Sequence, residues 1–305
     1  MAADVHKSSQ DDARTWAAYL EGRKSLVEAA LTRFLPAEDV YPPVIFRAMR
    51  HSVLAGGKRL RPILCMAAAE AIGGDAETVL PAACALELIH TYSLIHDDLP
   101  AMDNDDFRRG RPTSHKVFGE DIAILAGDAL LTEAFHLLSR PDWARSLPPE
   151  RRLAAIHDIA GAAGFRGMVG GQVVDVQSEG KAVDRETLHY IHTRKTGAMI
   201  VVSIRAGAAL AGADPEAVRA LTAYGERAGL AFQIADDILN VEGDAARMGK
   251  RTGSDAARGK ITYPALGHVR PESGTFECWY RPSVDSERQK PFEQRTFSGN
   301  REIFT

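Results

Sequence analysis

The chain has 305 residues, of which 45% are hydrophobic and 26% charged, and its formal net charge is -4. These values are typical of a globular protein and give no sign of a nucleic-acid or polyanion surface, so any argument from charge must be local. The three cysteines lie far apart and lack metal-ligand spacing. This usage fits a reduced compartment and disfavours a disulfide framework or a zinc site, so packing thiols are expected.

The first residues lack an apolar stretch of the signal-peptide type. No run reaches the roughly 18 uncharged apolar residues that a membrane span needs. The best candidate, 198–212, is interrupted by Arg205. We therefore expect a soluble, cytoplasmic protein without a membrane span, whose substrate could still be apolar.

Apolar residues recur at helical spacing from about Arg14 to Leu266, and strand-like alternation is nearly absent. This pattern predicts an all-α fold. Asp75 is placed to cap a helix that runs into the sequence HDDL, and Pro81 inside this helix predicts a local kink or a later start. Several segments are apolar around much of their circumference, which predicts one multi-helix bundle.

A second helix opening is predicted at Asp214 and Pro215, because aspartate can cap a helix and proline suits its first position. This helix should run to about Asn240. Breaks at 73–74, 140–149 and 178–184 indicate loops between helices, not linkers between domains.

The composition changes after Leu266, where proline, glycine, serine and charge increase and helical periodicity disappears. We expect one helical domain at 1–267 and an atypical, irregular tail at 268–305, which could be disordered or frameshifted.

The densest chemistry is the segment IHDDLPAMDNDDFRRG, which contains Asp97, Asp98, Asp103, Asp105 and Asp106. Like charges this close repel one another and favour a bound divalent cation, and ligands that are all carboxylates favour a hard ion such as Mg2+. A calcium-binding EF-hand loop is excluded, because the register from Asp103 places a phenylalanine at its fifth position and offers no glutamate at its twelfth.

A second acidic cluster, Asp236 and Asp237 with Asn240, lies near the end of the long apolar helix predicted above. Asp236 and Asn240 share one helix face, and these groups must face water or a metal because a buried unpaired charge costs several kcal/mol. The two clusters together predict a shared site, since they can face each other across one cavity.

Basic residues accompany both clusters, and metal-bound carboxylates interleaved with cations make a site for a diphosphate. These cations are Lys58, Arg59 and Arg61 in GGKRLRP, Arg108, Arg109 and Arg111 after the first cluster, and Lys195, Lys250, Arg251 and Lys260 near the second.

At these residues the sequence resembles the trans-prenyltransferases, and within them the bacterial farnesyl and geranylgeranyl diphosphate synthases. The motifs that carry the resemblance occur in family order between about Gly56 and Leu266: GGKRLRP, DDLPAMD with RRG, HKVFGEDIAILAGDALL, GGQVVD, KTGA, FQIADDILN and GKITYPAL. The resemblance implies a bundle of the isoprenoid synthase type with a central active-site cavity, and a homodimer. It also implies an Mg2+-dependent enzyme, in which Mn2+ can substitute, that joins isopentenyl diphosphate head to tail with dimethylallyl or geranyl diphosphate.

The resemblance also implies a role for each matching residue. Isopentenyl diphosphate would be held by Lys58, Arg61, His90 and Arg109. Mg2+ would be held by Asp97 and Asp103 with Asp236, and the neighbouring Asp98 and Asp237 are further expected metal ligands in the two acidic motifs. The allylic diphosphate would be held by Arg108, Lys195, Thr196, Gln233, Lys250 and Lys260. The residues expected to act directly in catalysis are Asp97, Asp98, Asp103, Arg108, Lys195 and Asp236.

Product length in this family often depends on the position of Tyr92, five residues before Asp97. An aromatic ring there blocks the tunnel for the growing chain and favours farnesyl over geranylgeranyl diphosphate, although a plain core tyrosine is an equal alternative. The chain departs from the family at Asn240, where a third aspartate is common, and in the tail, where further helices normally close the bundle.

Three other functions remain to be separated from this one. A histidine-aspartate phosphohydrolase would use His96 as a metal ligand, but it leaves the second acidic cluster and GGKRLRP unexplained. A non-catalytic subunit of a heteromeric prenyltransferase would fit the altered tail but not the intact first motif. A terpene cyclase would not need Lys58 and Arg61.

Overall fold

The computed structural model describes residues 2–143, 147–181, 183–242, 276–277 and 296–297, with side chains described between Thr15 and Ile238. The helices are α1 (Ala2–Phe34), α2 (Pro43–Val53), α3 (Leu60–Ala71), α4 (Ala76–Asp97), α5 (Ser114–Phe118), α6 (Glu120–Leu138), α7 (Pro149–Ala163), α8 (Met168–Ser178), α9 (Arg185–Ile191), the π-helix η2 (His192–Gly197), α10 (Ala198–Ala211) and α11 (Pro215–Glu242). The strands are β1 (Phe107–Arg108), β2 (Arg111–Pro112), β3 (Phe276–Glu277) and β4 (Thr296–Phe297), in two antiparallel pairs. The predicted all-α fold is confirmed.

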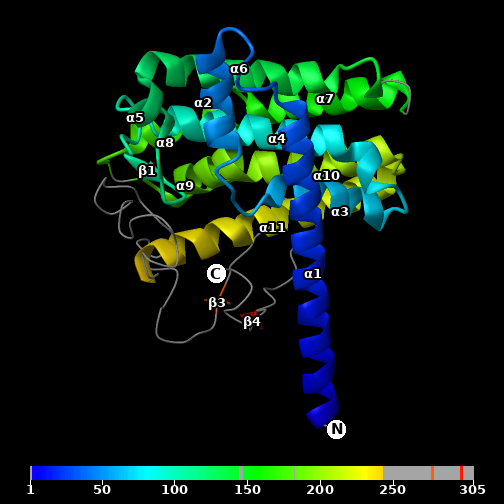
Figure 1. Cartoon of the computed structure of the whole chain (residues 1–305). Coiled ribbons are helices and arrows are strands. Elements are labelled where there is room, and N and C mark those ends of the chain that lie inside the picture. Colours follow the sequence, from blue (N-terminus) through cyan, green and yellow to red (C-terminus); the bar gives the residue numbers. More distant parts are fainter. Residues whose placement is uncertain (1, 144–146, 182, 243–275, 278–295, 298–305) are drawn as a thin grey trace.

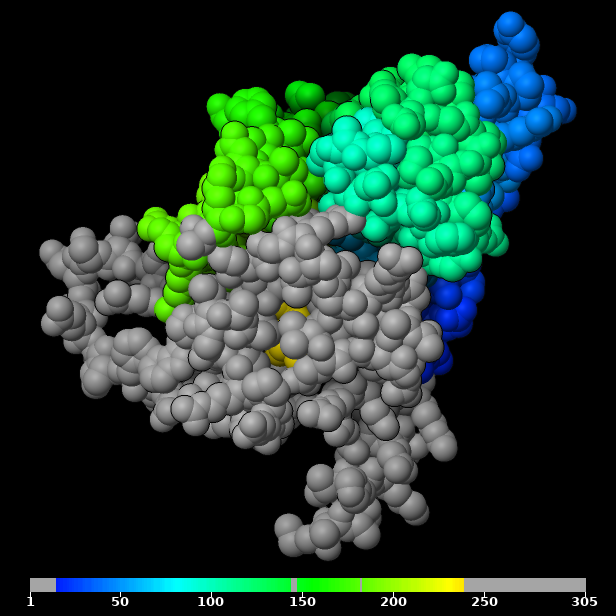
Figure 2. Space-filling view, turned by 90° about the vertical axis from the view of Figure 1, so that its left-hand side faces the viewer, coloured from blue at the N-terminus to red at the C-terminus, as the bar shows by residue number. Residues whose placement is uncertain are grey.

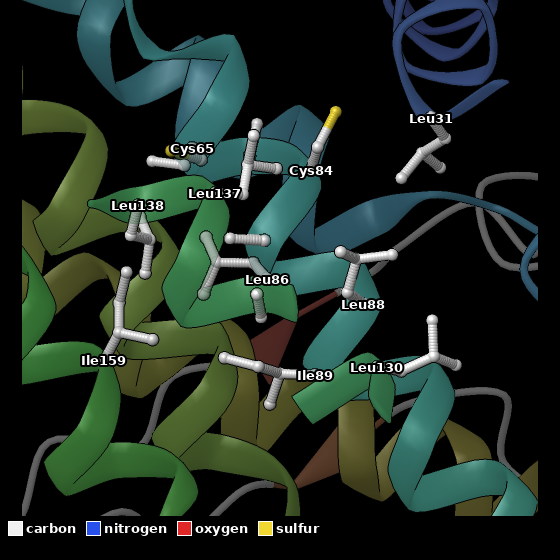
Figure 3. Close-up of a cluster of buried hydrophobic side chains, with 14 of the residues drawn as sticks. Leu31, Cys65, Cys84, Leu86, Leu88, Ile89, Leu130, Leu137, Leu138 and Ile159 are labelled. Carbon is white, nitrogen blue, oxygen red and sulfur yellow. The ribbon is translucent and has the colours of Figure 1, made fainter. Parts of the chain in front are cut away.

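Helix α4 runs through the middle of the bundle and packs against α3, α6 and α10 (Figure 1). Its side chains Leu86, Leu88 and Ile89 are fully buried, and they meet Leu130 of α6 in the cluster that Figure 3 shows. Because α4 is buried on nearly all sides, the residues at its carboxyl end are held on a rigid support.

The start of α4 follows the predicted cap. The Asp75 carboxylate accepts hydrogen bonds from the backbone N–H groups of Glu77 and Thr78, at 3.3 and 3.1 Å. The alternative of a later start at Pro81 is wrong, because this cap lets the helix begin at Ala76 and run continuously to Asp97.

By length and composition, α4 could cross a membrane, and it is the one helix that passes this test in the described part of the chain. However, 72% of its apolar window is buried inside the bundle. The core helix of a helical bundle is also long and apolar, because other helices surround it.

The second predicted helix opening is also confirmed. The Asp214 carboxylate accepts a hydrogen bond from the Ala217 N–H at 2.8 Å, and α11 runs from Pro215 to Glu242. The three predicted breaks lie between helices. The boundary predicted at residue 267 falls outside the described residues and stays a prediction.

Cys65 and Cys84 are buried as free thiols, and burial raises the pKa of Cys65 to about 12 and that of Cys84 further. These two cysteines are therefore packing residues, as expected. Cys278 lies outside the described residues.

Candidate active site

The first acidic cluster begins at the carboxyl end of α4, where the chain folds back on itself. The Asp103 N–H donates to the Asp97 carbonyl oxygen at 2.7 Å, and the Asp105 N–H donates to that of Asp98 at 3.2 Å. Asp97 and Asp103 therefore start from adjacent backbone positions, which lets their carboxylates approach a common ion.

Asp98 has a different environment from its two neighbours. Its side chain is buried, and its Oδ1 atom accepts a hydrogen bond at 2.6 Å from the Nε of Arg108, whose Nη2 lies 2.6 Å from the same oxygen. Burial raises the pKa of the Asp98 carboxyl, and Arg108 opposes that change. This ion pair ties the end of α4 to strand β1 and orients Arg108 beside the acidic cluster.

The GGKRLRP segment lies against the hairpin β1–β2. The Arg109 guanidinium donates to the Gly56 carbonyl, and a Cβ on Gly57 would come within 2.5 Å of the Arg109 Cζ atom. Gly57 also has a φ of +128°, which side chains rarely adopt. Because Gly56 and Gly57 have no side chains, the Arg109 guanidinium can pack against the backbone next to Lys58.

His90 faces this group of cations from α4. Burial, together with the charges of Arg61, Arg109 and Arg108, holds the pKa of His90 well below its ordinary value of 6.5. Burial also lowers the pKa of Arg61 and Arg109. The His90 imidazole is consequently neutral at neutral pH and can donate one hydrogen bond to an anion.

The π-helix η2 contains the first three residues of the KTGA motif, whose Ala198 begins α10, and it packs against α8, α10 and α11. The Lys195 Nζ donates to Asp175 of α8 at 2.6 Å. A Cβ on Gly171 would come within 2.2 Å of the Lys195 backbone nitrogen, so glycine there permits the close approach of α8 to η2. Thr196 follows on the same turn. A π-helical turn is a frequent feature of functional sites.

The second acidic cluster lies beside η2. Gln233 donates to Asp237 at 3.0 Å, and the His192 Nε2 lies 3.7 Å from the Asp237 Oδ2. Burial lowers the pKa of His192 to about 4. Asp236 is adjacent to this network on α11 and is half-buried.

Both acidic clusters lie at the same end of the bundle. In Figure 1 the hairpin that follows α4, labelled at β1, and the carboxyl end of α11 lie on the left-hand side. Figure 2 looks onto that side, where a small part of the yellow of α11 is visible below the green and cyan atoms. The ends of these two elements thus lie on one side of the bundle, and the shared site of the two clusters stays a prediction.

Tyr92 is buried on α4 and packs edge-on against His96, with ring centroids 5.7 Å apart. The His96 Nε2 donates to the Ile124 carbonyl of α6 at 3.0 Å. A Cβ on Gly127 would lie 2.1 Å from that nitrogen, so glycine makes room for the ring. This packing argues against His96 as a metal ligand and against the phosphohydrolase alternative.

The carboxylates of the site fit Mg2+ when the phosphate oxygens of a diphosphate substrate are counted as further ligands. No group of three acidic, histidine or cysteine side chains capable of holding an ion alone occurs among the described residues. Mg2+ typically takes one or two carboxylates, with waters and substrate phosphates completing its shell. Asp97 and Asp103, with Asp236 from α11, are carboxylates of the required kind.

Some predicted residues cannot be placed. Lys250 and Lys260 lie outside the described residues, and the side chain of Asn240 is not described. Conversely, sequence reasoning missed Asp175, Glu87 and His192. Asp175 ends the quoted motif GGQVVD, which was its only signal, whereas nothing in the sequence marks Glu87 or His192.

Comparison with known proteins identifies the class of enzyme. The family described as Polyprenyl synthetase matches residues 42–291. The chain belongs to this family, and it is a short-chain prenyl diphosphate synthase, a prenyltransferase that uses isopentenyl and allylic diphosphates. The resemblance drawn from the motifs is confirmed.

Similar proteins carry two different product names. The chain is 52% identical to a farnesyl diphosphate synthase of Geobacillus stearothermophilus, over 81% of this chain and 83% of that one. It is 47% identical to a geranylgeranyl diphosphate synthase of Cyanophora paradoxa, over 82% and 83%. A solved geranylgeranyl pyrophosphate synthetase of Pyrococcus horikoshii shares 37% identity at a TM-score of 0.73, covering 81% of this chain and 74% of that one.

Proposed function

We propose that this enzyme makes farnesyl diphosphate by Mg2+-dependent, head-to-tail condensation of isopentenyl diphosphate with dimethylallyl and then geranyl diphosphate. The observation that supports this product is Tyr92, a buried aromatic residue on α4 between the hydrophobic core and Asp97. The geranylgeranyl diphosphate synthase is the alternative, because similar proteins carry both names.

In this proposal the two diphosphates bind to separate groups of cations. Lys58, Arg61 and Arg109 take isopentenyl diphosphate, and the neutral His90 adds one hydrogen bond. A desolvated arginine is worth more to a phosphate than one in water, because the local dielectric constant is lower.

The allylic diphosphate lies between Arg108 on the hairpin and Lys195 and Thr196 on η2, with Gln233 reaching it from α11. Lys250 and Lys260 are further ligands in this proposal. These residues orient the diphosphate so that its allylic carbon points toward the second substrate.

Asp97, Asp98, Asp103, Asp236 and Asp237 form the acidic wall of the site, in which Asp97, Asp103 and Asp236 are the metal ligands. Bound Mg2+ supplies charge neutralisation for the leaving diphosphate. The residues Arg108 and Lys195 add fixed positive charge where negative charge develops as the allylic C–O bond breaks.

The carbon chemistry needs no covalent protein nucleophile. The electron pair of the breaking C–O bond leaves with diphosphate, and an allylic carbocation remains. The double bond of isopentenyl diphosphate attacks that cation, and a proton is then lost to the departed diphosphate. The apolar surroundings of α4 exclude water, which would otherwise capture the cation.

Product analysis tests the proposal directly. Purified enzyme with Mg2+, isopentenyl diphosphate and either dimethylallyl or geranyl diphosphate should give a 15-carbon product from both primers. Tyr92→Ala should shift the product to 20 carbons, since the ring no longer blocks the tunnel. The matched control is Tyr190→Ala, a partly exposed tyrosine on α9, which should leave product length unchanged. A 20-carbon product from the unaltered enzyme would contradict the assignment in favour of the alternative.

The remaining expectations concern the whole protein. We expect a homodimer, a soluble cytoplasmic enzyme, and Mn2+ as a substitute for Mg2+. Turnover of allylic substrate by the purified chain alone would exclude a non-catalytic subunit of a heteromeric enzyme.

A further inference from the structure

A buried carboxylate on α4, Glu87, pairs with an arginine of the GGKRLRP segment. Its Oε1 atom accepts a hydrogen bond from the Arg59 Nη1 at 2.7 Å, and both side chains are 1% exposed. The Arg59 Nη2 donates to the Val53 carbonyl at 2.6 Å, and its Nε lies 3.7 Å from the Glu28 Oε1 of α1. One guanidinium therefore joins α1, α2 and α4.

The backbone around Arg59 depends on these contacts. Arg59 has φ 50° and ψ 35°, the left-handed conformation, which costs a residue with a side chain roughly 1–2 kcal/mol. The conformation directs the chain from Lys58 into the first turn of α3, which carries Arg61. If Arg59 loses its contacts, the backbone conformation that orients Lys58 and Arg61 is lost as well.

The same pair influences Arg109 across the loop. The Gly56 carbonyl just before Lys58 accepts a hydrogen bond from the Arg109 guanidinium. The charge of Glu87 opposes the lowering of pKa that burial imposes on Arg61 and Arg109. Glu87 thus acts electrostatically on Arg61 and Arg109 but is hydrogen-bonded to Arg59, which has no role in substrate binding in the proposed function.

We propose that Glu87 and Arg59 are positioning residues for isopentenyl diphosphate, whose buried ion pair holds Lys58, Arg61 and Arg109 in the arrangement that receives that diphosphate. Neither residue touches the substrate. This inference rests on the proposed function, because it takes those three cations as the isopentenyl diphosphate site.

The test replaces both partners together, Arg59→Met with Glu87→Leu, because removal of one alone would leave an unpaired buried charge. The double variant keeps the packing volume and should remain folded by circular dichroism. Its KM for isopentenyl diphosphate should rise about tenfold, which corresponds to about 1.4 kcal/mol of binding. Its KM for geranyl diphosphate should change less than about twofold, since those ligands lie on other elements.

A matched control removes an ion pair away from the site, Arg205→Met with Asp158→Leu. That pair joins α10 to α7 at 2.8 Å. Both KM values should stay unchanged in the control, so a general loss of stability cannot account for a selective effect. Equal KM values in the Arg59/Glu87 variant and the unaltered enzyme would overturn the inference.

A second variant covers the case in which the double variant fails to fold. Arg59→Lys keeps the charge but cannot bond Val53 and Glu87 at once, because lysine lacks the planar fork. Its KM for isopentenyl diphosphate should rise about threefold, and an unchanged value would again overturn the inference.

The two proposals fail in different ways. If Arg61→Ala leaves the KM for isopentenyl diphosphate unchanged, the proposed site itself is wrong. If Arg61→Ala raises that KM strongly while the Arg59/Glu87 variant and Arg59→Lys do not, the site stands and only the positioning role is wrong.

Discussion

The two halves of the proposed site hold their cations by different means before substrate binds. The isopentenyl half comprises Lys58, Arg61, His90 and Arg109, and the allylic half comprises Arg108, Lys195, Thr196 and Gln233. In the isopentenyl half, the carboxylate of Glu87 accepts a hydrogen bond from Arg59, and Arg109 donates a hydrogen bond to the Gly56 carbonyl.

In the allylic half the cations themselves contact carboxylates. Arg108 pairs with Asp98 and Lys195 with Asp175, each at 2.6 Å. A diphosphate that binds there must share or replace those partners. The comparison teaches that the isopentenyl half is organised in advance, whereas the allylic half exchanges one set of charge contacts for another.

The largest effect is expected from the metal ligands, which would serve the allylic half. Asp97→Ala or Asp236→Ala should reduce kcat by about a thousandfold or more, because charge stabilisation in the transition state is lost. The fold should remain intact, since Asp97 is the last residue of α4 and Asp236 lies within the last two turns of α11. Steady-state kinetics with circular dichroism checks this expectation.

Asp106→Ala is the matched control for that experiment. Asp106 lies in the same segment but pairs with Lys116 at 2.7 Å on the surface. Its kcat should stay within about twofold of the unaltered enzyme. Near-normal rates in Asp97→Ala or Asp236→Ala would refute the metal assignment.

A smaller effect is expected from Lys195. Lys195→Met should raise the KM for the allylic diphosphate by about ten- to a hundredfold and leave that for isopentenyl diphosphate nearly unchanged, because one charged hydrogen bond to phosphate is lost. The control is Lys181→Met, an exposed lysine beside the same helix α8. If both KM values rise together, the division of the site into two halves does not hold.

The smallest effect is expected on the free energy of unfolding at low pH, through His90 of the isopentenyl half. Because the pKa of His90 is held below 6.5 in the folded protein, the unfolded chain binds its proton first as pH falls. Stability is therefore present above about pH 6.5 and is lost as pH falls below it, with a slope of at most about 1.4 kcal/mol per pH unit for this one group.

Urea unfolding between pH 7 and pH 5 measures that slope. His90→Asn should flatten it, whereas His157→Asn, at an exposed position on α7, should leave it as it is. An unchanged slope in His90→Asn would show that folding does not lower the pKa of His90.

Much of the fold follows from local sequence signals. The caps at Asp75 and Asp214 are decided by residues within three positions, so their helices begin where the sequence predicts. Pro81 shows the limit of such reasoning: its missing N–H is tolerated near the start of α4, and packing of the rest of the helix outweighs the expected delay.

In the candidate site, too, local patterns could be predicted from the sequence and distant contacts could not. Acidic clusters and GGKRLRP mark the chemistry in the sequence because each is a dense local pattern. The partners of those groups are not local: Asp175 is 20 residues from Lys195, and Glu87 is 28 residues from Arg59. A single glutamate on an apolar helix gives no sign of the arginine that it will meet.

The sequence by itself determined an all-helical prenyltransferase with two acidic clusters and their companion cations, because helical periodicity, caps and motif spacing are written within short stretches of chain. Only the tertiary structure decided which distant carboxylate meets a given cation, such as Glu87 for Arg59 and Asp175 for Lys195. The reason is physical: a charge is buried only where a distant partner meets it, and the packing of α4 against α3 and of η2 against α8 brings those partners together.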